Sequence, residues 1–228
     1  LNVFVAYHHD EDAIAAQATL VLLAIGSGAG AVYGQLGVAG GIIVATLLLH
    51  GIAIHRKSGN LAAMGIAFSN IWIGLHAFST GWNIGALEIV SFDEPLLLFL
   101  LLGGINAVNA AIAAHFARAE NWFSQALSLV GLGKPGLWSV SIGLGMGGAL
   151  LAIAAHRAET SYSLGLVAML LASFGGSYLV VRGVALKRVV TPMAGGLIPI
   201  IFILILIESG LIEMRFELTG YDVFTALA

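Results

Sequence analysis

The chain has 228 residues, of which 59% are hydrophobic and only 9% are charged. A soluble domain carries about 25% charged residues, so this composition excludes a water-soluble globular fold. The formal net charge of −3 and the lack of a long basic run argue against a nucleic-acid partner. The chain has no cysteine, which excludes disulfides, thiolate metal ligands and a cysteine nucleophile.

The apolar residues are grouped in continuous runs of about 20, the length of helix that crosses a bilayer core about 30 Å thick. Barrel strands would instead show alternating polarity and frequent turns. We therefore predict an all-α, polytopic integral membrane protein in which residues 1–228 form one transmembrane helical bundle surrounded by lipid.

Seven spans are expected in chain order, with six crossings as the alternative if the glycine-rich first or fifth run does not cross. Residues 26–30 of the first run are glycine-rich and predict tight packing or a kink. The acidic segment before residue 13 does not resemble a cleaved targeting peptide, and the mixed tail after Glu213 is expected at the surface. The spans cover residues 13–34, 37–55, 61–78, 96–117, 137–155, 162–181 and 189–211.

Residues 121–132 are too short to cross the bilayer, and Trp122 near their start predicts an interfacial helix. Basic residues favour cytoplasmic loops. With a cytoplasmic N-terminus, seven of the nine Lys and Arg residues fall in inside loops, which places the C-terminus on the opposite side. These seven are Arg56, Lys57, Arg118, Lys134, Arg182, Lys187 and Arg188.

Polar side chains deep in a membrane are expensive and mark candidate sites. Asn106 and Asn109 lie near the centre of the fourth span, three residues apart and so on one helical face. Ser69 and Asn70 lie near the centre of the third span. These residues either line a pathway for a small solute or form hydrogen bonds between helices.

Glu208 is the one carboxylate clearly inside an apolar run. It is either a coupling or cation-attracting group or a side chain that reaches the outer interface. Pro192 and Pro199 interrupt the same span, as in the broken helices of transporters, although a purely structural kink is an equal alternative.

His50 and His76 are weak candidates for a metal or haem site, because imidazoles on two helices can ligate a metal. No second pair of histidines with metal-ligand spacing accompanies them, and interior hydrogen bonding is the alternative. We therefore predict no cofactor, with haem or metal kept as an open alternative.

Residues 40–76 resemble the acetate uptake transporter family. The resemblance rests on Gly40-Gly41, on the basic turn Arg56-Lys57-Ser58-Gly59-Asn60, and on Ala67-Phe68-Ser69-Asn70 with Trp72. The family's Asn-Pro-Ala-Pro-Leu-Gly signature is absent here, and the family has six spans. The resemblance implies an oligomeric helical bundle that passes small monocarboxylates, with Phe68, Ser69 and Asn70 near the pathway.

Three functions follow from these patterns. The first is a membrane channel or transporter for a small solute, for which Phe68, Ser69, Asn70, Asn106, Asn109 and Glu208 are the pathway candidates. The second is a non-catalytic membrane subunit of a larger complex, so homo-oligomers or other membrane subunits are the expected partners. The third is a haem- or metal-binding intramembrane protein. An enzyme is less favoured, because no Gly-x-Ser-x-Gly motif or paired intramembrane carboxylates occur.

Overall fold

The computed structural model describes residues 12–79, 82–84, 87–156, 160–209 and 211. The expectations for the first residues of the chain and for the tail after Glu213 lie outside this range. The predicted all-α class is confirmed. Its helices are α2 (Asp12–Arg56), α3 (Gly59–Phe78), α4 (Pro95–His115), α5 (Trp122–Leu129), α6 (Leu137–His156), α7 (Thr160–Val181) and α8 (Leu186–Glu208). Between α3 and α4, the short strands β1 (Asn83–Ile84) and β2 (Leu87–Glu88) pair antiparallel.

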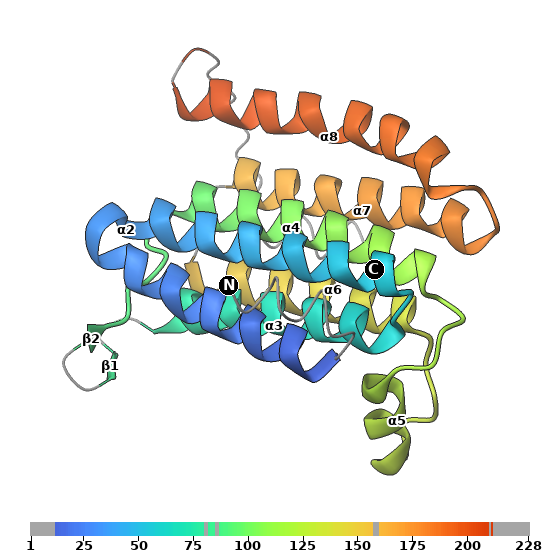
Figure 1. Ribbon diagram of the computed structural model, residues 1–228. Coiled ribbons are helices and arrows are strands. Elements are labelled where there is room, and N and C mark those ends of the chain that lie inside the picture. The colour runs from blue at the N-terminus through green and yellow to red at the C-terminus, as the bar shows by residue number, and fades with distance from the viewer. Residues whose placement is uncertain (1–11, 80–81, 85–86, 157–159, 210, 212–228) are drawn as a thin grey trace.

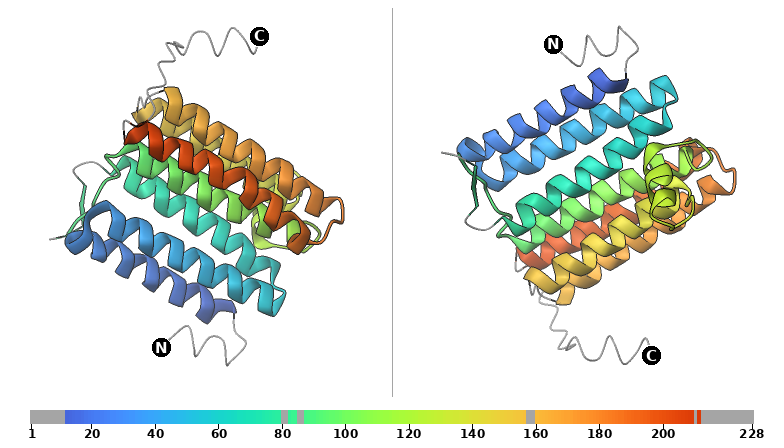
Figure 2. Two further views of the ribbon diagram at one scale, coloured as in Figure 1. Left: turned by 90° about the horizontal axis from the view of Figure 1, so that it is seen from above. Right: turned by 90° about the horizontal axis from the view of Figure 1, so that it is seen from below.

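The long helix α2 is folded back on itself at Gly34. Gly34 has φ 60° and ψ −149°, a conformation that a residue without a Cβ adopts readily. Figures 1 and 2 show the two halves of α2 running side by side in opposite directions. They touch where Gly26 meets Gly41, because a Cβ on Gly26 would lie only 2.8 Å from the Gly41 Cα atom. The glycine-rich stretch is therefore a close-packing surface, and the chain reverses beyond it.

Six helical segments within the described residues are long and apolar enough to cross a membrane. Such segments satisfy their own backbone hydrogen bonds, and the protein is a polytopic membrane protein. The first half of α2 contains only the shorter apolar helix Gln17–Gly30, so a seventh crossing stays a prediction. The six segments are Val32–Arg56, Gly59–Phe78, Pro95–His115, Leu137–His156, Ser161–Val181 and Leu186–Glu208.

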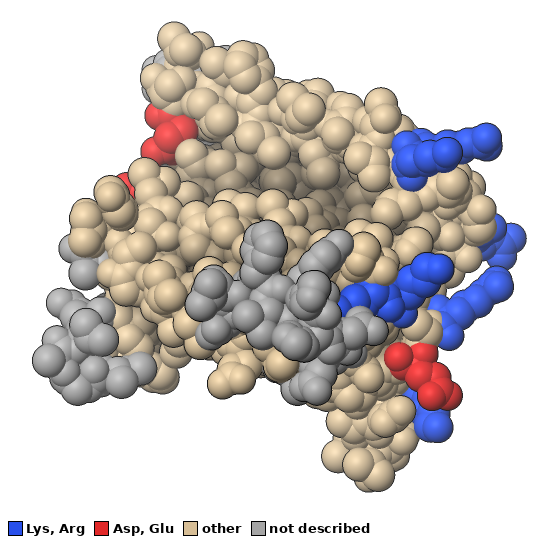
Figure 3. Space-filling model, in the orientation of Figure 1, with Lys and Arg blue, Asp and Glu red and all other residues tan. Residues whose placement is uncertain are grey.

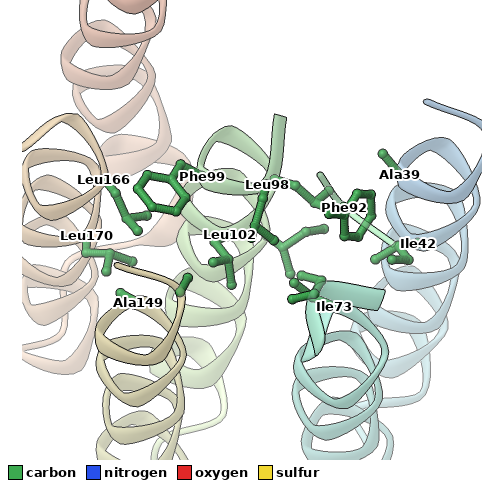
Figure 4. Close-up of a cluster of buried hydrophobic side chains, with 14 of the residues drawn as sticks. Ala39, Ile42, Ile73, Phe92, Leu98, Phe99, Leu102, Ala149, Leu166 and Leu170 are labelled. Atoms are coloured by element: carbon green, nitrogen blue, oxygen red, sulfur yellow. The ribbon is translucent and has the colours of Figure 1, made fainter. Parts of the chain in front are cut away.

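Helix α4 is the centre of the bundle, and α8 lies at its periphery. In the most apolar window of α4, 67% of the residues are buried, against 6% in α8. Leu98, Phe99 and Leu102 of α4 meet side chains from α2, α3, α6 and α7 in one apolar cluster (Figure 4). Figure 2 shows the α2 hairpin on one side of the array and α7 with α8 on the other. A polar residue on α4 therefore has neighbours on several sides.

The connection between α4 and α6 contains the predicted extra helix. Helix α5 begins at Trp122, after Asn121, whose side-chain oxygen accepts a hydrogen bond from the Ser124 amide over 2.9 Å. It ends at Leu129, shortly before Gly131 with φ 81°, and is shorter than the predicted 121–132. It lies beyond the end of the bundle (Figure 1).

Candidate functional site

A chain of hydrogen bonds joins three helices inside the bundle. Nε2 of His50 on α2 lies 2.8 Å from Oδ1 of Asn109 on α4. Nδ2 of Asn109 donates to Oγ of Ser69 on α3 over 3.0 Å. The three side chains are buried. We call His50, Asn109 and Ser69 the polar triad.

The proton positions in the polar triad follow from the backbone carbonyl of Ile66, which accepts a hydrogen bond from Ser69. The Ser69 hydroxyl donates to the carbonyl oxygen of Ile66 over 3.2 Å, because a carbonyl can only accept. The Ser69 oxygen therefore accepts from the Asn109 amide, and the Asn109 carbonyl faces His50, whose Nε2 carries the proton. In a neutral imidazole Nδ1 is then an acceptor. Nδ1 of His50 is buried and has no hydrogen-bond partner.

Gly65 makes room for the His50 ring. A Cβ on Gly65 would lie 2.5 Å from Cε1 and 2.8 Å from Nδ1 of His50, closer than real Cβ contacts. The ring edge that bears Nδ1 thus lies against the α3 backbone. The position of the polar triad depends on this glycine as well as on its own hydrogen bonds.

Asn106 faces a different helix from Asn109. It lies near the middle of α4, and its Nδ2 donates to the Leu102 carbonyl over 3.0 Å. A Cβ on Gly145 of α6 would lie 3.0 Å from its Oδ1. Oδ1 of Asn106 is buried without a hydrogen-bond partner, and so is Oγ of Ser141, four residues before Gly145. Because residues four apart share a helix face, Ser141 and Gly145 lie on the same side of α6.

A second series of hydrogen bonds, which is part-buried, ties the first half of α2 to α3. Nε1 of Trp72 donates to Oγ of Ser27 over 2.8 Å, and that Oγ lies 2.8 Å from Nε2 of His76. Nδ1 of His76 lies 2.7 Å from the Val90 carbonyl. Because that carbonyl only accepts, Nδ1 carries the proton and Nε2 accepts from the Ser27 hydroxyl. Each polar group in this series of hydrogen bonds has a partner, as expected for side chains that hold two helices together.

The two histidines do not form one metal site. His50 packs against Gly65 and His76 is eleven residues further along α3, about 16 Å at 1.5 Å per residue. Within the described residues, no three His, Asp or Glu side chains are grouped so that they could hold a metal ion. The two rings instead take opposite tautomers in separate hydrogen-bond chains.

The other predicted pathway residues lie apart from the polar triad. Phe68 is half-buried where the two apolar clusters of the bundle meet. Asn70 is half-buried, donates to the Ile66 carbonyl of its own helix over 2.8 Å, and lines a groove of about 300 Å³ between α3, α4 and α6. Glu208 is exposed at the end of α8. Of the six candidates, Ser69 and Asn109 are hydrogen-bonded to each other.

Of the two alternatives for the last span, a broken helix or a structural kink, the broken helix is not observed. Helix α8 continues through Pro192 and Pro199, and both prolines are exposed. Proline removes one backbone donor without ending the helix when its neighbours keep the helical conformation. Neither proline faces the polar triad, so they do not shape a pathway there.

Sequence reasoning assigned no site role to Ser27, Trp72 or Ser141. Serine and tryptophan are ordinary residues of membrane helices, and nothing in their spacing marks these three. The one sequence signal is that Ser27 stands between Gly26 and Gly28, where close approach of another helix brings its hydroxyl within reach of a partner.

Charge separates the two ends of the bundle. The described Lys and Arg residues lie in the α2–α3, α4–α6 and α7–α8 connections or at the helix ends beside them, and Figure 3 shows blue side chains gathered at that end. Acidic side chains lie at the opposite end, below the C-terminal end of α8, and red atoms are also visible at the basic end (Figure 3). The loops that charge counting grouped together are thus together in space.

No protein-family model matches the chain, and no match was found among curated proteins or solved structures.

Proposed function

We propose that the protein is a transporter or channel that passes a small, uncharged, hydrogen-bonding solute through the interior between α2, α3, α4 and α6. The observation that carries this proposal is that two of the buried atoms without a hydrogen-bond partner, Oδ1 of Asn106 and Oγ of Ser141, lie on the facing sides of α4 and α6. An unsatisfied buried polar group costs about 1–3 kcal/mol. Groups retained for structure alone would be expected to find partners, as those around His76 do.

The solute class follows from the buried polar side chains. The described ones are Thr, Ser, Asn and His, with no Lys or Arg among them. An anion would enter this interior without a cation to balance it, which is strongly unfavourable at low dielectric. Asn106 offers an acceptor and Ser141 a hydroxyl that can donate or accept. A neutral solute with one donor and one acceptor complements them.

The resemblance to the acetate uptake transporter family supports a monocarboxylate as the solute. A monocarboxylic acid in its protonated form carries one O–H donor and one carbonyl acceptor, so it meets the same requirement. We therefore propose that such a solute crosses as the neutral acid. Ser69 and Asn109 then belong to the wall of the pathway, on the side of α4 toward α2 and α3.

The test is solute flux into proteoliposomes, with lactate and glycerol as probes. Asn106→Leu should reduce flux about tenfold, equivalent to about 1.4 kcal/mol, while the protein still elutes as a folded species. Ser173→Ala is the control, because Ser173 is a buried polar residue of α7, outside the proposed pathway, and bonds only within its own helix. Flux of both probes that is no higher than in protein-free vesicles, or equal in wild type and Asn106→Leu, would refute the proposal.

We also propose that the basic end of the bundle faces the cytoplasm, following the preference of Lys and Arg for that side. Because the chain has no cysteine, single cysteines can report this directly. In intact cells, an impermeant maleimide should label Glu94→Cys and should leave Lys187→Cys unlabelled. The reverse pattern would invert the orientation.

A non-catalytic membrane subunit is the second candidate. The groove between α3, α4 and α6 favours it, since its wall includes Gly74, Gly143 and Gly147, and small residues let another helix approach closely. Purification in mild detergent distinguishes the two functions. A homo-oligomer that supports flux favours the transporter, whereas stoichiometric copurification of other membrane proteins without flux favours the subunit.

A further inference from the structure

A hollow of about 340 Å³ lies at the acidic end of the bundle, between the start of α4, the start of α7 and the end of α8. Its polar lining comes from Glu94, Tyr162 and Glu208, and its apolar lining from Pro95, Leu96, Leu97 and Leu100. The hollow is remote from the polar triad along the helix axes. It is therefore a site separate from the proposed solute pathway.

The two carboxylates in this hollow form no side-chain hydrogen bond or ion pair within the described part of the chain. Glu94 immediately precedes α4, yet its side chain makes no capping hydrogen bond. Glu208 is the last residue of α8, where the partial negative charge of the helix end disfavours a carboxylate. Both side chains are exposed, and the Lys and Arg residues that the structure describes are at the other end of the bundle.

Tyr162 provides an independent observation. Its side chain is only 8% exposed and belongs to the central apolar cluster. Its hydroxyl forms no hydrogen bond within the described part of the chain, while the residue lines the hollow. A tyrosine hydroxyl usually has a partner when the residue is buried. The open hydroxyl therefore points to a ligand in the hollow.

We propose that this hollow binds an organic ammonium group. The cation lies between Glu94 and Glu208, and Tyr162 contributes its hydroxyl oxygen as an acceptor. An alkyl portion then contacts Leu96, Leu97 and Leu100. An anion would be repelled by the carboxylates, and a bare divalent metal would find too few oxygen ligands beside an apolar wall.

The ammonium group can come from a free alkylamine or from the headgroup of an aminophospholipid in the surrounding leaflet. Both sources present the same chemistry to the two carboxylates. The experiment therefore has two arms, both carried out on the full chain. The first uses nanodiscs of phosphatidylglycerol, which contains no amine, and the second uses nanodiscs of phosphatidylglycerol and phosphatidylethanolamine in equal amounts.

In the first arm, hexylammonium is titrated by isothermal calorimetry, with hexanol as the uncharged control. In the second arm, native mass spectrometry measures retention of phosphatidylethanolamine over phosphatidylglycerol. The Glu94→Gln/Glu208→Gln variant should weaken binding about tenfold, equivalent to about 1.4 kcal/mol, and Tyr162→Phe should weaken it less. Asp93→Asn is the matched control, since Asp93 is exposed, accepts a hydrogen bond from Ser91 and lies outside the lining.

Saturable binding in the first arm alone identifies a free amine, and selective retention in the second identifies a lipid headgroup. Either result supports the proposal if the double variant loses it and Asp93→Asn keeps it. Binding in neither arm, or equal binding by the double variant and Asp93→Asn, overturns it. Because neither arm measures flux, the result does not depend on whether the central polar groups pass a solute.

Discussion

Replacing Asn109 with leucine tests the polar triad directly. The variant removes the hydrogen bonds of Asn109 to His50 and to Ser69, which measure 2.8 and 3.0 Å. Leucine has the same branched arrangement of heavy atoms as asparagine but no hydrogen-bonding groups, so the main effect is chemical. It also leaves the Nε2–H group of His50 buried without an acceptor.

The expected loss in the free energy of unfolding is about 3 kcal/mol. Interhelical hydrogen bonds in membranes contribute about 0.6–2 kcal/mol each, so the two bonds together account for about 2 kcal/mol. The unpaired imidazole N–H adds about 1 kcal/mol or more. Reversible unfolding by denaturing detergent in mixed micelles measures the difference from wild type.

Asn70→Leu is the matched control for stability, because it makes the same substitution at a half-buried position whose bond stays within one helix. We expect it to change stability by about 0.5 kcal/mol or less, as for substitutions away from buried networks. If Asn109→Leu and Asn70→Leu have the same stability, the polar triad contributes nothing to the fold and our reasoning about it is wrong.

Three further variants test the close contacts of the bundle. Gly65→Ala should destabilise the protein by about 1–3 kcal/mol, because its Cβ would overlap the His50 ring, whereas Gly74→Ala on the same helix has open space and should be neutral. Gly26→Ala should separate the two halves of α2 and destabilise the protein by a similar amount. Gly28→Ala should leave stability unchanged, because nothing lies within 4 Å of its Cβ. Thermal unfolding in detergent measures the stability of all four glycine variants. Ser27→Ala removes the hydroxyl that links two side chains of α3, so hydrogen exchange of the first half of α2 should become faster than in wild type. Equal stability within either glycine pair, or unchanged exchange in Ser27→Ala, would contradict the corresponding contact.

The sequence alone determined the fold class and the distribution of charge. Bilayer thickness sets a minimum length for an apolar helix, so span length and composition are local properties that can be read along the chain. The position of each basic residue along the chain is also a local property, so counting charges assigned the basic connections to one side of the membrane. The structure places these connections at one end of the bundle. The short helix after Asn121 was also predictable, because its length and its Trp122 are local features.

Only the tertiary structure decided which polar groups meet. Asn106 and Asn109 are separated by about 60° around α4, close enough to predict a shared face. Because α4 is surrounded by other helices, that small angle turns Asn109 toward α2 and α3 and Asn106 toward α6. The boundary between the first two spans, at residues 34–37, was predictable from the sequence, but the contact of Gly26 with Gly41 between the two halves of α2 depended on packing. Residue spacing specifies a direction from a helix axis, but the partner in that direction is set by how the helices pack against one another.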